Sequence, residues 1–242
     1  FANISYIDDK LGELMDVLKR TRQEAIVVFL SDHGEMLGER GLWFKMNFYE
    51  GSARVPLMIS APGMAPGRVD TPVSTIDVLP TLCDLAGISL EEIAPWTDGR
   101  SLAQGADMRG PVAMEYAAEG SIAPLVCLRD DDWKYIACDA DPEMLFNLAL
   151  DPDERTNLVG HPGAGEVLER MRAMAAERWN LPAYDAEVRE SQARRWIVYE
   201  ALRNGAYFPW DYQPLMKASE RYMRNHMDLN VLEDSKRFPR GE

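Results

Sequence analysis

AIVVFLSDHGEMLGERGLWFK, residues 25–45, decides how this sequence folds. It opens with an apolar run, partly β-branched, which is typical of a strand buried on both faces in a parallel sheet. The run ends in Asp32 and His33, and polar, glycine-punctuated residues then lead to Lys45. Ligands of open α/β sheets bind at the carboxyl ends of the strands. We therefore expect a ligand site where this strand ends.

The segments around this stretch predict an α/β layer. Apolar residues recur at helical spacing over residues 4–20, with acidic residues between them. VPLMIS, residues 55–60, predicts a second central strand. Thr75 is expected to cap a helix that covers the sheet and ends at Ala86, with Gly87 closing it. The apolar face of that helix is predicted to hold Ile76, Leu79, Leu82 and Leu85.

A smaller sheet is predicted after residue 110. PVAMEY, PLVCLRD and WKYIAC are short strands, and the acidic turn at residues 130–132 joins the last two as an antiparallel hairpin. MLFNLALDPDERTNLV predicts a further strand that runs into a loop. A helix should follow with one apolar face, made of Val167, Leu168, Met171, Met174 and Ala175.

The composition changes again near Asp185, so three parts are expected: residues 1–110, 111–184 and 185–242. The last part holds a charged helix with Trp196, Ile197, Ala201 and Leu202, and then the aromatic stretch NGAYFPWDYQP. Such a segment has little core of its own. It should pack either on the main body or on a neighbouring subunit, and both arrangements stay open.

Bulk properties exclude two classes of partner. The net charge of −14 argues against nucleic acid, whose binders carry a basic face. The apolar run at residues 25–30 is too short to cross a membrane. Cys83, Cys127 and Cys138 are expected to be reduced thiols, which suggests a reducing compartment. No signal peptide pattern is visible at the start, and the start in mid-pattern suggests a fragment or a processed chain.

Asp32 and His33 are the predicted metal ligands. A carboxylate suits calcium, magnesium or manganese, and an imidazole tolerates manganese or zinc. Spacing alone leaves a second reading open, in which Asp32 accepts backbone N–H groups at the Gly34 turn and His33 is exposed. A lone loop lysine such as Lys45 is also commonly a solvated surface charge.

Three segments resemble the sulfatase family in order along the chain. SDHGEMLGERGLWFK is similar to the family's strand-ending Asp-His-Gly with a lysine about a dozen residues later. TPVSTIDVLPTLCDLAGI resembles the next helix, and MLFNLALDPDERTNL the later strand and loop. Within that superfamily, RNGAYFPWDYQP and ASERYMRNH resemble the C-terminal extension of choline sulfatases.

The resemblance implies the alkaline-phosphatase-like α/β/α sandwich, a smaller antiparallel C-terminal sheet and a helical or extended tail. It implies hydrolysis of a sulfate ester, with choline-O-sulfate giving choline and sulfate. Asp32 and His33 match the ligands of a divalent ion, calcium first, with manganese or magnesium as alternatives. Lys45 matches the residue that contacts the sulfate oxygens, where a preorganised charge stabilises the transfer. The family also implies a cytoplasmic homo-oligomer, a dimer or a tetramer.

The choline end of the substrate would need aromatic faces and a carboxylate, because a quaternary ammonium has no N–H to donate. MEYAAEGSIAP offers Glu119 first and Glu115 second, next to Tyr116. The other reading of this stretch is a solvated acidic loop. A cation pocket and a solvated loop both stay open.

One family feature does not occur in these 242 residues: the Cys/Ser-x-Pro-x-Arg motif that is oxidised to the formylglycine nucleophile. We expect it on the N-terminal half of the same enzyme, so this chain alone should be incomplete for catalysis. Two alternatives stay open. The chain could act on aryl sulfates or on phosphonate or phosphate monoesters, or it could be a non-catalytic remnant with a structural or oligomerisation role.

Overall fold

Along the chain, helices and short strands come first, a run of longer strands follows, and two long helices come last. The computed structural model describes residues 2–22, 24–103, 105, 110–118 and 120–203. Its α-helices are α1 (Ala2–Thr21), α2 (Glu50–Ala53), α3 (Val78–Ala86), α4 (Leu90–Ile93), α5 (Gly165–Arg178) and α6 (Leu181–Arg203). Its strands are β1 (Val27–Leu30), β2 (Met36–Leu37), β3 (Trp43–Phe44), β4 (Leu57–Ser60), β5 (Val112–Tyr116), β6 (Leu125–Asp130), β7 (Trp133–Cys138) and β8 (Asp141–Asn147). Short 3-10 helices lie at η1 (Glu39–Gly41), η2 (Thr75–Asp77) and η3 (Pro162–Ala164).

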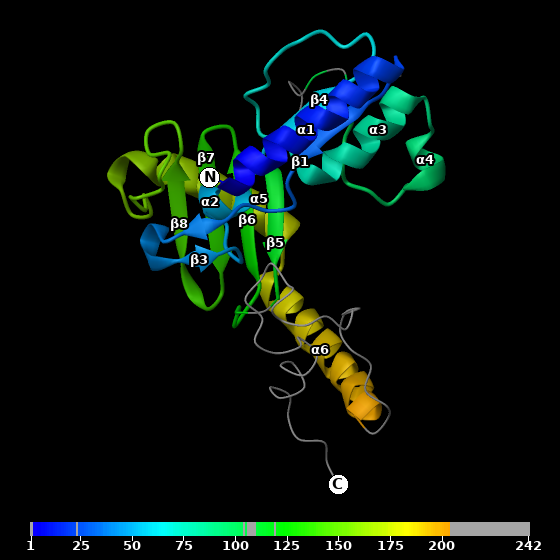
Figure 1. The fold of residues 1–242 in the computed structure, drawn as a ribbon. Helices are drawn as coiled ribbons and strands as arrows, with labels where there is room; N and C mark the ends of the chain where they lie inside the picture. The colour runs from blue at the N-terminus through cyan, green and yellow to red at the C-terminus, as the bar shows by residue number, and fades with distance from the viewer. Residues whose placement is uncertain (1, 23, 104, 106–109, 119, 204–242) are drawn as a thin grey trace. The chain divides into compact units, whose positions relative to one another are not determined.

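The chain divides into two compact units, residues 1–182 and residues 183–242. The first unit contains all the strands listed above (Figure 1). In the second unit the structure describes the helical residues of α6. None of the described helices is both long and apolar enough to cross a membrane.

The first helix and strand form as predicted, but their surroundings differ from the prediction. Helix α1 covers the predicted residues 4–20, yet none of its residues is buried. β1 was expected in a buried parallel sheet and pairs antiparallel with β4, with Val28 opposite Ile59. Its residues are half-buried or exposed. Composition indicated an apolar strand correctly, but it does not encode the direction in which a strand pairs.

Helix α3 has a different cap and a different buried face from those predicted. Ser74, not Thr75, is the N-cap of the preceding η2 turn, and its side chain accepts from the Ile76 N–H. Gly87 closes the helix in the left-handed conformation, as expected, at φ 68°. The buried residues are Pro80, Thr81 and Cys83, whereas two of the predicted core residues, Ile76 and Leu79, are exposed.

The reason is the loop that follows α4. Its backbone N–H groups at Arg100 and Leu102 donate to Asp77 Oδ1 at 2.9 Å and to Thr81 Oγ1 at 2.9 Å. These polar contacts cover the side of the helix that holds Thr81. An apolar periodicity could not indicate them, because they are made by a buried threonine and a buried aspartate.

The main core lies around the four-stranded antiparallel sheet, whose order is β5-β6-β7-β8. All four predicted strands are present, and β6 and β7 form the expected hairpin. Helix α5 packs on one face through Leu168, Met171 and Ala175, as predicted. Phe48 packs on the other face, against Cys127, Ile136 and Phe146. In Figure 1 α5 lies behind this sheet, and α2 and the β2–β3 hairpin lie in front of it.

The cysteines form no disulfide, in agreement with the prediction of free thiols. Cys83 and Cys127 are buried, and burial raises the pKa of the Cys127 thiol to about 12. A thiol in that environment stays protonated and behaves as a small apolar core residue.

Candidate functional site

The β2–β3 hairpin brings the residues predicted for the site together. β1 ends at Leu30, and Asp32 and His33 follow it directly. In the hairpin Met36 lies opposite Phe44, so the chain returns and Lys45 comes back alongside the start of β2. Lys45 Nζ lies 3.1 Å from His33 Nε2. The spacing of a dozen residues in the sequence is thus the length of one hairpin.

Hydrogen bonds fix the state of the His33 ring. Its Nδ1 lies 2.8 Å from the Gly34 carbonyl oxygen, which can only accept, so Nδ1 carries the proton. Nε2 lies 3.1 Å from the Lys45 ammonium, which can only donate, so Nε2 presents a lone pair. A metal-binding histidine commonly shows this arrangement, with the far nitrogen donating to a backbone carbonyl.

Asp32 lies beside this lone pair. Its Oδ2 is 3.3 Å from His33 Nε2, and its side chain is 81% exposed. The His33 backbone N–H donates to Asp32 Oδ1 at 2.9 Å, and this hydrogen bond holds the pKa of the Asp32 carboxyl below its ordinary value of 3.8. The carboxylate is therefore ionised at neutral pH. An anionic oxygen next to an imidazole lone pair is a donor pair that fits one divalent ion.

The donor pair alone does not complete a metal site. Across the residues that the structure describes, no group of three or more His, Cys, Asp or Glu side chains lies close enough to hold a metal ion. Calcium takes six to eight oxygen ligands, so Asp32 and His33 would supply only part of its shell.

The backbone on both sides of Lys45 is held in an unusual conformation. Phe44 and Met46 have φ angles of 69° and 76°, in the left-handed region that non-glycine residues rarely adopt. Arg40, in the same hairpin, has φ 56°. Such conformations cost energy and persist where the surrounding structure enforces them, often at functional sites.

Of the two glutamates predicted to face a choline cation, Glu115 lies away from this site. Trp179 Nε1, at the end of α5, donates to Glu115 Oε1 at 2.6 Å. Its strand neighbours Met114 and Tyr116 pack with Phe48 on the opposite face of the sheet, which is the face toward the segment after Lys45. Glu119 lies outside the described residues.

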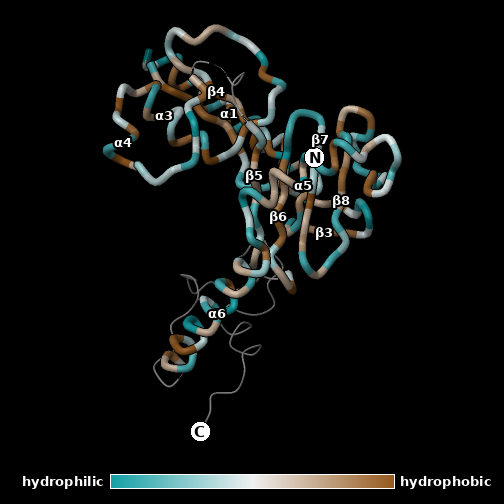
Figure 2. Tube along the Cα trace, turned by 180° about the vertical axis from the view of Figure 1, so that it is seen from behind, coloured by the Kyte–Doolittle hydropathy of each residue, from teal (hydrophilic) through white to brown (hydrophobic). Residues whose placement is uncertain are grey.

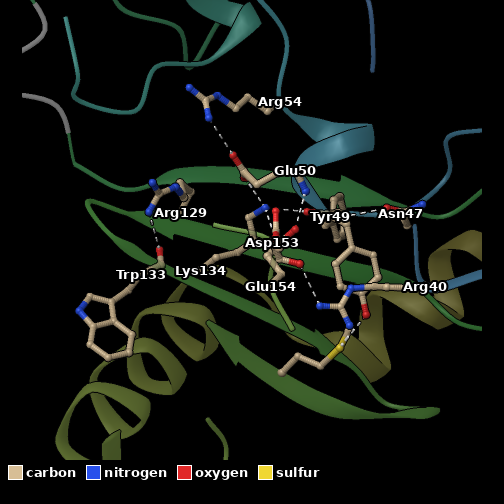
Figure 3. Close-up of polar contacts among 12 residues, drawn as sticks. Arg40, Asn47, Tyr49, Glu50, Arg54, Arg129, Trp133, Lys134, Asp153 and Glu154 are labelled. Atoms are coloured by element: carbon tan, nitrogen blue, oxygen red, sulfur yellow. Dashed lines mark hydrogen bonds and ion pairs between the residues drawn. The ribbon is translucent and has the colours of Figure 1, made fainter. Parts of the chain in front are cut away.

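A buried lysine was missed by the sequence analysis. Lys134 on β7 is 0% exposed, and its ammonium forms ion pairs with Glu50 and with Glu154, the latter at 2.9 Å. Figure 3 shows these three side chains between α2 and the sheet. Two signals were available: a lysine within an otherwise apolar strand, and the position of Glu154 in the family-like DPDE segment.

Comparison with known families extends these observations to the whole chain. Residues 1–88 match the family described as Sulfatase, and residues 186–238 match the one described as Choline sulfatase enzyme C terminal. A choline-sulfatase of Rhizobium meliloti is 64% identical over 251 aligned residues, which include all of this chain and 49% of that protein. Arylsulfatase K of Xenopus laevis is 33% identical and aligns with 86% of this chain and 41% of its own length. The chain thus spans about half the length of these relatives.

Solved structures show the same relationship. A structure determined in complex with its substrate D-glucosamine-2-N,6-O-disulfate aligns with 72% of this chain and 38% of its own, with a TM-score of 0.62 and 25% identity. Phosphonate monoester hydrolase of Agrobacterium radiobacter aligns with 73% of this chain and 40% of its own, with a TM-score of 0.60 and 28% identity. The mixed α/β chain with its four-stranded antiparallel sheet therefore shares a fold with part of each of these two proteins.

Proposed function

Since this chain is a homologue of the choline sulfatases, we propose that it is part of a hydrolase that converts choline-O-sulfate to choline and sulfate. The observation that carries the proposal is the identity of 64% over the full chain, including the tail segment that matches the choline sulfatase C-terminal family. The match of the tail distinguishes choline sulfatases from other sulfatases, because the first 88 residues, which hold Asp32, His33 and Lys45, match sulfatases in general. We propose the α/β/α sandwich for the complete protein, with residues 1–110, 111–184 and 185–242 as its parts in this chain.

In this proposal Asp32 and His33 hold part of a divalent metal, calcium first and manganese or magnesium as alternatives. The ionised carboxylate and the Nδ1–H tautomer support this role, because an anionic oxygen of Asp32 then lies 3.3 Å from the Nε2 lone pair of His33. A bound divalent ion would polarise the sulfate ester as a Lewis acid.

Lys45 is proposed to contact the sulfate oxygens. Its ammonium lies within hydrogen-bond distance of His33 Nε2, so it is next to the place where a metal would bind. If His33 Nε2 held a metal ion, the Lys45 ammonium would be free to donate to an anion beside it. A fixed positive charge beside the non-bridging oxygens stabilises the negative charge that builds up during transfer.

The nucleophile and the remaining metal ligands are proposed to come from the N-terminal half of the same enzyme. The sulfatase nucleophile, formylglycine, forms in a Cys/Ser-x-Pro-x-Arg motif that these 242 residues do not contain. Relatives about twice as long as this chain support the proposal.

For the choline end we keep Glu119 as the proposed carboxylate. Glu115 is a weaker candidate than the sequence suggested, because it accepts from Trp179 on the α5 face of the sheet. Tyr116 packs on the other face of the sheet, against the cluster that contains Phe48, and an aromatic ring suits a quaternary ammonium.

A cytoplasmic homo-oligomer, dimer or tetramer, is proposed for the assembled enzyme. Helix α6 exposes Trp196, Ile197 and Leu202 at 55%, 69% and 65%, and Figure 2 shows hydrophobic segments near its C-terminal end. Exposed apolar side chains of this kind suit burial against another surface. The aromatic stretch at residues 204–214 lies outside the described residues. The free cysteines fit a reducing compartment.

The competing function is hydrolysis of another ester by the same site. The likenesses to arylsulfatase K and to a phosphonate monoester hydrolase favour an aryl sulfate or a phosphonate monoester as the alternative substrate. A non-catalytic role is the remaining alternative.

The deciding experiment compares kcat/KM of the natively purified protein for choline-O-sulfate, an aryl sulfate and a phosphonate monoester, before and after treatment with a chelator. We expect metal-dependent turnover with choline-O-sulfate preferred. A preference for either of the other esters would transfer the proposal to that substrate. Turnover of none of them would leave the non-catalytic reading.

A further inference from the structure

The ammonium of Lys134 uses all three of its donors at one place. It donates to Glu154 Oε1 at 2.9 Å, to the Phe48 carbonyl oxygen at 2.9 Å and to Glu50 Oε1. The second oxygen of Glu154 accepts the backbone N–H of Glu50 at 2.7 Å. We call Lys134, Glu50 and Glu154 the buried lysine cluster. It joins β7 to the first residue of α2, as Figure 3 shows.

The cluster contacts the segment that follows Lys45. Phe48 follows Lys45 by three positions, and its carbonyl is one of the three acceptors of Lys134. The left-handed backbone of Phe44 and Met46 on either side of Lys45 needs an anchor of this kind, because it costs energy on its own.

The same short helix also touches the segment of His33. The Gly34 N–H donates to the Ser52 carbonyl at 2.7 Å, and Ser52 is buried. A Cβ at Gly34 would stand 2.1 Å from the Gly51 carbonyl oxygen, so the two backbones are in direct contact. Helix α2 is therefore fixed by Lys134 at its first residue and, two residues later, holds Gly34, the residue next to His33.

Burial makes this cluster costly to disrupt. Lys134 and Glu154 are 0% and 2% exposed, and the Glu50 side chain is 22% exposed. Removing the ammonium leaves two carboxylates close together with no cation between them, and buried charges without a counter-charge are strongly unfavourable. Arg54, 3.9 Å from Glu50 Oε2, is exposed and cannot replace a buried donor.

We propose that Lys134, Glu50 and Glu154 are positioning residues that hold Lys45 and His33 at hydrogen-bond distance, so that the site depends on the four-stranded sheet. The proposal rests on the proposed function for its effect on turnover. Its structural part stands on the contacts alone, and the experiment below separates the two.

The test uses the natively purified protein with Lys134→Met, which removes the ammonium and keeps an unbranched side chain of similar length. The matched control is Arg172→Met. It breaks an ion pair with Glu143 on the α5 side of the same sheet, away from α2. Amide hydrogen exchange is measured over residues 31–54 and over residues 165–178. kcat and KM for choline-O-sulfate are measured per folded molecule.

We expect K134M to speed exchange in residues 31–54 more than in residues 165–178 and to lower kcat by about 10- to 100-fold. R172M should show the opposite exchange pattern and leave kcat unchanged. If K134M does not fold, Glu50→Gln makes the same test more gently, since it removes one charge from a partly exposed side chain.

A folded K134M whose exchange over residues 31–54 and kcat equal those of the wild type would overturn the proposal. Equal acceleration in both segments would also overturn it, because it would mean general destabilisation only. If the wild type hydrolyses no sulfate ester, the proposed function fails, and the exchange pattern alone decides whether the cluster positions the site.

Discussion

The strands β6 and β1 have similar apolar sequences but very different surroundings. In β6, Val126, Cys127 and Leu128 are 1%, 0% and 2% exposed, because α5 and the Phe48 segment cover both faces of the sheet. In β1 the side chains are only half-buried, and Leu30 is 40% exposed. An apolar strand is therefore buried only where other elements cover it. The described chain covers the four-stranded sheet and leaves the β1–β4 pair open.

The proposed metal ligands lie with the less covered of these two regions. Asp32 and His33 follow β1, whereas Lys134 belongs to the well-packed sheet. Contacts at α2 join the two regions. The site therefore takes its chemistry from one region and its rigidity from the other.

The largest effect on activity is expected from Lys45→Met, in the region of the proposed site. Loss of one charge aimed at the sulfate oxygens should lower kcat for choline-O-sulfate by about 100- to 1,000-fold. Lys10→Met is the matched control, because Lys10 lies on exposed α1 and forms its ion pair with Glu13, a neighbour on the same helix. Steady-state kinetics would check this, and equal activities of the two variants would remove Lys45 from the site.

The difference in burial itself is tested by truncating one side chain in each region. Leu145→Ala in β8 should lower the free energy of unfolding by about 2–5 kcal/mol, because Leu145 is 0% exposed. Ile7→Ala in α1 should change it by about 0.5 kcal/mol or less in this chain, because Ile7 is 52% exposed. Denaturant unfolding of the 242-residue chain measures both. A similar loss in the two variants would break the comparison.

The junction at α2 is tested by a pair of glycine substitutions. Gly34→Ala should cost about 1–3 kcal/mol of stability, because the new Cβ would stand 2.1 Å from the Gly51 carbonyl oxygen. A Cβ added at Gly12 on α1 would meet no other part of the structure within 4 Å. Gly12→Ala should therefore stabilise the protein by about 1 kcal/mol or less, through the higher helix propensity of alanine. Thermal unfolding would check both signs. A neutral G34A would mean that α2 and the His33 segment are not in contact.

The smallest effect should be a pH-dependent one on the α5 side of the sheet. Arg172 donates to Glu143 and holds the pKa of that carboxyl below its ordinary value of 4.5. A depressed folded-state pKa adds stability that is present above the unfolded value and is lost as the pH falls through the folded one. R172M should therefore be less stable than the wild type at pH 7, by about 1 kcal/mol or less since the pair is partly exposed.

That stability difference should shrink below about pH 4.5, where Glu143 in the unfolded chain is protonated. Urea unfolding of both proteins at several pH values would show it. A difference that is independent of pH would mean that Arg172 acts by packing and not through the charge of Glu143.

The helices and strands could be predicted from the sequence, but the segments that each of them packs or pairs with could not. Helical spacing indicated α1, and alternating apolar runs with the Asp130–Asp132 turn indicated β5–β8. The direction of β1, the Ser74 cap and the buried face of α3 were wrong or missed. These features depend on which segments meet in space, and neither periodicity nor composition contains that information.

The same limit applies to the site. The sequence already indicated that Asp32, His33 and Lys45 belong together, and the structure places Asp32 and Lys45 each close to His33 Nε2, because the length of a hairpin is a local property. The side of the sheet that Glu115 faces, and the burial of Lys134, follow from the register of β5 and β7 in the assembled sheet. They could be found only once the strands were paired.

In the proposed function, hydrolysis depends on a metal ion held at the end of β1. The most direct measurement is the metal content of the natively purified protein together with its turnover of choline-O-sulfate, for the wild type, Asp32→Asn and the control Asp8→Asn on exposed α1. We predict that the wild type and D8N carry a divalent ion and release sulfate, and that D32N loses both. A D32N protein that keeps its ion and its turnover would contradict the account.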